Sequence, residues 1–199
     1  MALTRTPPDR WVQAGLQALA DGGPDAVRIE QLAKALGVTK GGFYWHFDDR
    51  QALLDTMLDT WERAVIDDVI ERVEGEGGDE RTRLRRLFAL AASTRDLLRL
   101  ELAIRDWARR DGRVAVRLRR VDNGRMAYMR TLFEAFCQDR DDVEARCLLV
   151  YSLFIGSHYV AADHPGRSRA DVLQLTLERL LAQGQADFVR LWRFRGLQS

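Results

Sequence analysis

Hydrophobic residues recur at helical spacing along almost the whole chain, and no run of alternating β-branched residues bounded by turns is present. The clearest apolar stripe runs from Ile29 to Leu36 with the spacing i, i+3, i+4 and i+7, and Gly37 follows it as a C-terminal cap. The pattern predicts an all-α fold.

The other expected helices follow from the same spacing and from capping signals. A long helix starts at the acidic pair Asp48-Asp49 and ends at the glycine-rich segment 75–78. Asn123-Gly124 is a turn signal inside one expected helix, where the apolar spacing favours a continuous or kinked helix over a break. Ser168 and Asp171 form a capping-box-like start. The remaining expected helices are 9–20, 40–47, 79–93, 97–110, 114–138, 142–162, 168–183 and a short piece at 186–194.

Residues 29–47 have the pattern of a helix-turn-helix unit. A tight turn through Gly37, Val38 and Thr39 joins the helix at 29–36 to a short helix at 40–47, for which Thr39 is the expected N-cap. Phe43 and Phe47 are spaced to turn inward. Such a unit places its second helix in the major groove of DNA, leading with its N-terminal residues.

The outer face of this short helix is chemically suited to DNA, because Thr39, Lys40, Tyr44 and His46 all carry hydrogen-bond donors. Lys40 is positioned to reach the O6 and N7 acceptors of a guanine or a phosphate. Tyr44 and His46 suit phosphate contacts, and Arg50 is a second phosphate candidate. A purely structural helical hairpin is the alternative that the pattern leaves open.

Gly41 and Gly42 are unfavourable in a short helix, at a cost of about 1 kcal/mol each relative to alanine. One interpretation is that the missing side chains let the backbone sit deep in the groove, in which case DNA shape supplies part of the specificity. The other is that tertiary packing tolerates the two glycines.

Charge and composition exclude some classes of protein without naming a partner. The 199 residues include 31 basic and 30 acidic side chains, and residues 1–50 carry six of each, so DNA binding would depend on the placement of charge. Cys137 and Cys147 lie in apolar helical patterns, and no cluster has metal-ligand spacing, so we expect reduced thiols and neither metal nor cofactor. The sequence shows no signal peptide and no apolar segment long enough to span a membrane, so we expect a cytoplasmic protein that is associated with the nucleoid when it binds DNA.

The stretch 32–47, LAKALGVTKGGFYWHF, followed by RQALL at 50–54, closely resembles the DNA-binding signature of tetracycline-repressor (TetR) family regulators. The resemblance covers about the first 55 residues. By position, Thr39, Lys40, Gly41, Gly42 and Tyr44 match the groove-facing part of that family's recognition helix, and His46 and Arg50 match its phosphate-contacting positions. Arg28 departs from the pattern, which often has threonine or serine there, and is included as a further phosphate candidate.

The resemblance implies a homodimeric, ligand-responsive repressor that binds a palindromic operator and is released by a small-molecule effector. A helix-turn-helix DNA-binding domain is expected over 1–50, and a helical ligand-binding and dimerisation domain over 51–199. In the family, ligand binding shifts the helix that joins the pocket to the DNA-binding domain.

Two residue sets in the larger domain are candidates for the effector and for the dimer. The helix at 142–162 is apolar nearly all round, which favours a partner surface. The predicted interface comprises Leu148, Leu149, Leu153, Ile155, Gly156, Leu173, Leu177 and Leu180. A largely apolar effector is expected to contact Trp61, Trp107, Met126, Met129, Phe133, Tyr151, Phe154 and His158, although each of these is also an ordinary core or interface residue by its spacing. The run Arg117, Arg119 and Arg120 is interpreted as a solvated helix face, with attraction of an anionic effector as the alternative.

Three other functions compete with a repressor. An enzyme is disfavoured, because the sequence has no phosphate loop, nucleophile elbow or metal cluster, and its three histidines lie in unlike contexts. A helical ligand-binding or interaction protein with a non-functional helix-turn-helix would dimerise without binding DNA. An activator of the same family differs from a repressor in operator position, which the chain does not encode.

Overall fold

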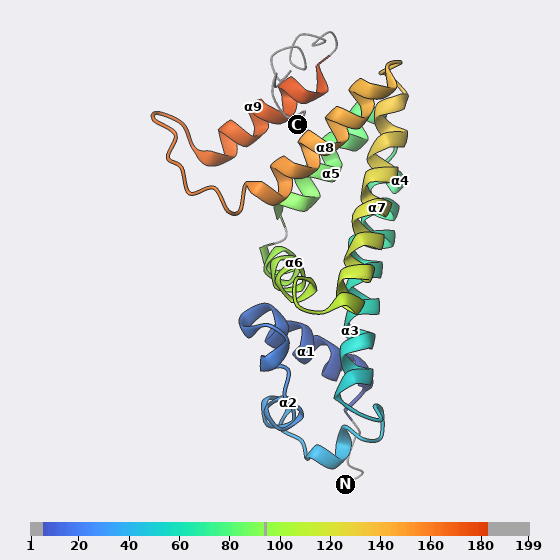
Figure 1. Ribbon diagram of the computed structural model, residues 1–199, viewed down its shortest axis with the longest axis vertical. Helices are drawn as coiled ribbons and strands as arrows, with labels where there is room; N and C mark the ends of the chain where they lie inside the picture. Colours follow the sequence, from blue (N-terminus) through green and yellow to red (C-terminus); the bar gives the residue numbers. More distant parts are fainter. Residues whose placement is uncertain (1–5, 94, 183–199) are drawn as a thin grey trace, which may run out of the picture. The chain divides into compact units, whose positions relative to one another are not determined.

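The computed structural model describes residues 6–93 and 95–182, which form helices and turns without a β-strand (Figure 1). The helices are α1 (Pro8–Gly22), α2 (Ile29–Leu36), α3 (Arg50–Val65), α4 (Asp67–Gly75), α5 (Glu80–Ser93), α6 (Arg95–Ala108), α7 (Gly112–Glu134), α8 (Arg140–Gly156) and α9 (Arg169–Leu181). Two short 3₁₀ turns, η1 (Pro24–Ala26) and η2 (Lys40–Gly42), flank α2. The predicted all-α fold is confirmed. None of these helices combines the length and apolar character needed to cross a membrane.

The chain divides into two compact units, each with its own hydrophobic core. The first comprises the residues up to Glu76 together with Ala89–Arg125, and the second comprises Gly77–Phe88 together with the residues from Met126 onward. In the first unit, α1 packs against α2, α3 and α6. In the second, α5, α8, α9 and the last part of α7 contribute the core side chains.

Local signals in the sequence explain several helix boundaries. Gly37 follows α2 with φ at 67°, a left-handed conformation that glycine adopts without strain, so the predicted cap is confirmed. The Asp49 side chain accepts a hydrogen bond from the Ala52 N–H (2.8 Å) at the start of α3. The predicted capping box of Ser168 and Asp171 is present at the start of α9.

The expected helix from Asp48 to residue 75 is divided at Ile66, so the prediction of one helix was wrong in this detail. The backbone hydrogen bonds from Ile66 N–H to Glu62 O (3.1 Å) and from Ile70 N–H to Ile66 O (2.9 Å) continue through the division, which is therefore a local distortion. A β-carbon on Gly124 of α7 would lie only 3.2 Å from the Ile66 Cδ1. This close approach explains the glycine inside α7, which is continuous as the spacing favoured.

Two other expected helices need correction, and a third lies beyond the part of the chain that the structure describes. The expected helix at 40–47 is a 3₁₀ turn over Lys40–Gly42 followed by hydrogen-bonded turns, and the Thr39 side chain makes no capping hydrogen bond. The helix expected at 142–162 ends at Gly156, where Arg169 donates to the carbonyls of Ser157 and Val160 beyond it. The short piece expected at 186–194 lies outside the described residues.

Candidate DNA-binding surface and effector-binding residues

The helix-turn-helix segment is held in place by aromatic side chains on its inner side. Phe43 and Phe47 are buried, and their rings stack with centroids 5.2 Å apart. Trp11 of α1 contacts Phe43 edge-on, with centroids 5.4 Å apart. Aromatic pairs in this geometry stabilise by about 0.5–1.5 kcal/mol beyond their buried area. The inward orientation predicted for both phenylalanines is confirmed, and it fixes which side of the segment faces solvent.

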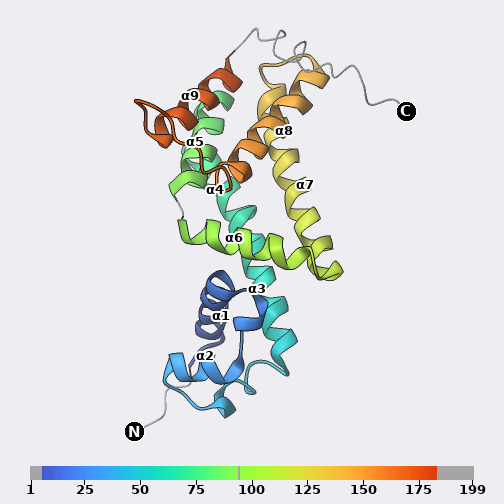
Figure 2. The same cartoon turned by 60° about the vertical axis from the view of Figure 1, so that its left-hand side comes forward.

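The outer side of the same segment carries the predicted groove-facing residues. Thr39, Lys40, Gly41 and Tyr44 are exposed, and 53% of the Tyr44 surface remains accessible. Gly42 is half-buried. The exposed side chains of Thr39, Lys40 and Tyr44 each have a donor, and we call this group with Gly41 the polar edge. The chain that carries it directly follows α2, whose place in the first unit Figure 2 shows.

Internal packing does not require Gly41 and Gly42. A β-carbon on Gly41 would lie 3.8 Å from the Thr39 Oγ1, and one on Gly42 would lie 3.9 Å from the Trp11 Cζ2. Both distances are ordinary van der Waals contacts, and neither glycine has a positive φ. The chain itself therefore leaves room for a methyl group at both positions.

Arg50 has a structural role that the sequence did not indicate. Its Nε donates to the carbonyl of Val27 (2.7 Å), and its Nη2 donates to the carbonyl of Pro24. The half-buried guanidinium thereby fastens the start of α3 to the η1 turn. A phosphate contact at this position, as the sequence predicts, would have to use the remaining N–H groups.

Two more of the predicted phosphate ligands, His46 and Arg28, also contact backbone carbonyls. The His46 Nε2 lies 2.9 Å from the carbonyl oxygen of Thr6, which connects the recognition segment to the residues before α1. Arg28 is exposed, and its Nε donates to the carbonyl of Asp25 (3.1 Å). It occupies the N-cap position of α2 without a side-chain capping bond.

Two features of this surface were missed by sequence reasoning. Trp45 lies between the buried Phe43 and Phe47 in sequence, and 67% of its surface is exposed. Its exposure could have been predicted, because position 45 does not share the i, i+4 spacing that places Phe43 and Phe47 in the core. The Lys40 ammonium forms an ion pair with the carboxylate of Glu30 in the first turn of α2. No sequence signal links these two residues, because they lie on different elements ten positions apart.

Six of the eight predicted effector-binding residues lie in, or pack against, two separate cores. Trp61 and Trp107 are buried in the core of the first unit. Met129 and Phe133 are buried in the second unit, with Met126 and Tyr151 packed against them. Phe154 stacks on Tyr151 with centroids 6.4 Å apart and meets His158 edge-on at 6.0 Å. Partial burial and the nearby Arg169 lower the pKa of His158.

Trp61 stands out among these residues because its polar atom is unsatisfied. Only 1% of its surface is exposed, and the described residues provide no hydrogen-bond partner for its Nε1. A buried donor without a partner costs about 1–3 kcal/mol and calls for an explanation. The indole N–H is consequently a candidate donor to a bound molecule.

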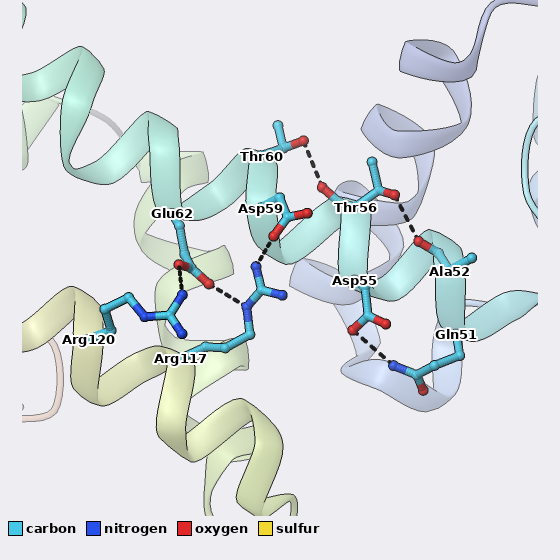
Figure 3. A network of polar contacts seen from close by, with 9 residues as sticks. All are labelled: Gln51, Ala52, Asp55, Thr56, Asp59, Thr60, Glu62, Arg117 and Arg120. Atoms are coloured by element: carbon cyan, nitrogen blue, oxygen red, sulfur yellow. Dashed lines mark hydrogen bonds and ion pairs between the residues drawn. The ribbon is translucent and has the colours of Figure 1, made fainter.

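An ion-pair network joins α3 to α7 close to Trp61, and Figure 3 shows it. Arg117 of α7 donates to the carboxylates of Asp59 and Glu62, while Arg120 contacts Glu62 at 3.4 Å. The Arg117 side chain is only 18% exposed, so its interpretation as part of a solvated face was wrong. The network instead ties α7 to the helix that begins beside the helix-turn-helix segment.

The predicted dimer residues differ in exposure. Leu148 is 60% exposed and Leu149 is 39% exposed on α8, opposite the buried Val143, Cys147 and Val150. The other predicted interface residues are half-buried: Leu153, Ile155, Gly156, Leu173, Leu177 and Leu180. Leu175 of α9, which was not predicted, is also 39% exposed.

Comparison with known proteins agrees with this arrangement. Residues 12–57 match the family model described as bacterial regulatory proteins, tetR family. The tetracycline repressor protein class A from transposon 1721 of Escherichia coli is 35% identical over 57 residues, which are 29% of this chain and 26% of that repressor. The match thus spans about a quarter of the relative's own length.

Similarity to solved structures extends over most of the chain and concerns the fold. A TetR-family regulator from Agrobacterium tumefaciens is similar with a TM-score of 0.71 and 13% identity, covering 88% of this chain and 97% of that one. The regulator FadR from Bacillus subtilis, solved in complex with stearoyl-CoA, has a TM-score of 0.66 and 16% identity, covering 88% and 98%. The N-terminal domain therefore belongs to the TetR family of bacterial regulatory proteins, and the helical fold of the chain is similar to that of solved TetR-family structures.

Proposed function

We propose that the protein is a ligand-responsive repressor that binds a palindromic operator as a homodimer and is released by a small-molecule effector. The observation that carries the DNA-binding part is the polar edge of Thr39, Lys40, Gly41 and Tyr44, which is exposed while Phe43 beneath it is buried. Donors on a rigid, aromatic-backed turn are suited to phosphate and base-edge contacts in the major groove. The proposed DNA-binding domain is 1–50, with 51–199 as the ligand-binding and dimerisation domain acting in the cytoplasm.

The room around Gly41 and Gly42 supports close approach to the groove. Since neither residue is required by packing or by φ, the conformational entropy that glycine loses on folding is explained if the DNA occupies the space that a side chain would fill. A methyl group at Gly41 should therefore weaken operator binding without lowering the stability of the protein.

The test of DNA binding is titration of the full chain against the DNA upstream of its own gene and against a scrambled duplex of equal length. Fluorescence anisotropy at fixed physiological salt should give a specificity ratio of about 10³ or more. Lys40→Ala and Gly41→Ala should lower operator affinity, whereas Lys34→Ala, on the exposed side of α2, serves as a charge-matched control for Lys40. Equal, salt-sensitive binding of both duplexes would favour a helical ligand-binding protein with a non-functional helix-turn-helix.

The proposed dimer uses the exposed leucines of α8 and α9. Leu148 and Leu149 are large apolar side chains in solvent in the single chain, and a second copy would remove them from water. Leu148→Glu should convert a dimer to a monomer in light scattering after size-exclusion chromatography. Wild-type protein that is monomeric at micromolar concentration would contradict the homodimer.

The proposed effector is largely apolar and has one acceptor for the Trp61 indole N–H. The supporting observations are the buried, unsatisfied Nε1 of Trp61 and the second predicted aromatic residue, Trp107, in the same core. Ligands should be screened by thermal shift and by release of operator DNA, with long-chain acyl-CoA thioesters included because of the stearoyl-CoA complex of the similar FadR. Trp61→Phe should reduce the affinity for a ligand that uses this donor, and Trp11→Phe, which removes another buried indole N–H without a partner, is the matched control. Equal effects of the two substitutions would contradict a specific role for Trp61.

A further inference from the structure

Glu30 and Lys40 form an ion pair on the solvent side of the helix-turn-helix unit. The Lys40 Nζ donates to the Glu30 Oε1, and both side chains remain accessible, at 49% for lysine and 66% for glutamate. The hydrogen bond from Lys40 lowers the pKa of Glu30, and the same bond raises the pKa of Lys40. Both groups are therefore charged at neutral pH, and a carboxylate lies directly beside the principal candidate for a base contact.

The fold itself gives little reason for this pair. Exposed ion pairs contribute little to protein stability. A carboxylate beside DNA is also unfavourable for phosphate binding, because it opposes the attraction that supplies most non-specific affinity. Glu30 thus weakens binding to DNA in general, and its position next to Lys40 calls for a functional explanation.

A G·C base pair matches the two groups in the major groove. Guanine presents two acceptors, N7 and O6, to which a lysine can donate, and cytosine presents the N4 amino donor, which a carboxylate can accept. The acceptors and the donor lie side by side on one base-pair edge, as the ammonium and the carboxylate lie side by side on this protein. An A·T pair presents its amino donor between two acceptors, adenine N7 and thymine O4, with the thymine methyl group at the end, so the ammonium finds no two adjacent acceptors there.

We propose that Glu30 and Lys40 together read one G·C base pair in each operator half-site, and that Glu30 disfavours DNA without it. The inference rests on the proposed DNA-binding function. In the free protein each side chain satisfies the other, and at the correct base pair guanine and cytosine take over part of that contact. Elsewhere, Lys40 can turn to a phosphate only by leaving the Glu30 carboxylate close to the negatively charged backbone.

The test compares wild type with Glu30→Ala and with Asp106→Ala. Asp106 is 66% exposed in an ion pair with Arg110 on α6, so its substitution removes the same charge from the same unit at a distance from α2. Binding of the full chain is measured on the upstream DNA and on scrambled DNA. It is also measured on duplexes in which each G·C pair of the DNA segment that the protein binds is replaced in turn by A·T. Each titration is repeated over a series of salt concentrations.

Wild type and Asp106→Ala should lose about tenfold in affinity when one particular G·C pair per half-site is replaced. Glu30→Ala should bind scrambled DNA about tenfold more tightly than wild type does. Its affinity should depend more steeply on salt, by about one phosphate contact per protomer. It should also lose most of its preference for G·C over A·T at that base pair. Glu30→Gln, which keeps the shape and removes the charge, should also bind scrambled DNA more tightly.

The inference is overturned if wild type distinguishes operator from scrambled DNA while Glu30→Ala keeps both the preference at every G·C position and the affinity for scrambled DNA. That result leaves the DNA-binding proposal intact. If wild type itself shows no preference for any duplex, the proposed function fails and this inference fails with it. Thermal denaturation of each variant establishes that the fold is retained, since position 30 is exposed and tolerates either replacement.

Discussion

The buried carboxylate of Glu101 should be among the most important polar groups for stability in the first unit. Glu101 lies on α6 with 2% of its surface exposed. It accepts two hydrogen bonds of 2.9 Å from the Arg125 guanidinium of α7 and one of 3.0 Å from Arg105 of its own helix. Arg105 in turn donates to both carboxylate oxygens of Asp122 on α7, at 2.7 and 3.2 Å. The network fastens α6 to α7, and we expect Glu101→Ala to loosen it.

The expected magnitude follows from the burial of each partner. Removing one member of a buried ion pair typically costs about 3–5 kcal/mol, because the other charge loses its compensation. Here the guanidinium groups of Arg105 and Arg125 retain 18% and 16% exposure, and Arg105 keeps its contact with Asp122. We therefore expect the lower end of that range, about 3 kcal/mol, which corresponds to a decrease in Tm of about 6–12 °C for a chain of this length.

The assay is urea denaturation followed by tryptophan fluorescence, which reports directly on this core because Trp61 and Trp107 belong to it. Glu101→Gln should be less damaging than Glu101→Ala, since the amide oxygen still accepts a hydrogen bond. Asp106→Ala, one helical turn and a residue further along α6, removes a carboxylate from an exposed pair and should stay within about 1 kcal/mol of wild type. If Glu101→Ala is no more damaging than Asp106→Ala, the network does not stabilise the unit and the reasoning is wrong.

Two further substitutions and one labelling experiment test other parts of the structure. Arg50→Ala should lower the free energy of unfolding by about 1–3 kcal/mol, because the carbonyls of Val27 and Pro24 lose their donor. Arg63→Ala, on the exposed side of α3, should leave this free energy unchanged. Thermal denaturation of both variants tests the difference. Burial raises the pKa of the Cys147 thiol to about 11, so at pH 8 about a thousandth of it is thiolate, and it should react with Ellman's reagent much faster after unfolding; rapid reaction in the native protein would contradict its burial. Ser168→Ala removes the capping box of α9 and should lower the free energy of unfolding by about 1 kcal/mol, as measured by urea denaturation. The control is Ser152→Ala, at an exposed serine within α8. If Ser168→Ala has no larger effect than this control, the cap does not stabilise the protein.

Much of the helical framework follows from the sequence, because its determinants are local. The apolar spacing over Ile29–Leu36 and the glycine after it fix α2 within one segment of chain. The capping box at Ser168 likewise depends on residues only three positions apart. The recognition motif is similarly contained in one continuous stretch, and the inward and outward sides of Phe43 and Tyr44 follow from their order in it.

Tertiary structure decides the features that depend on neighbours distant in sequence. The recognition segment adopts a 3₁₀ turn instead of an α-helix, with Phe43 docked against Trp11 of α1 and glycines that add little helix propensity. The partners of Arg50, Glu101 and Lys40 were likewise not predictable, because any of the chain's many carboxylates and carbonyls is an equally good acceptor by composition. Local spacing determines which face of a helix is buried, but only the packing of helices determines which charge meets which.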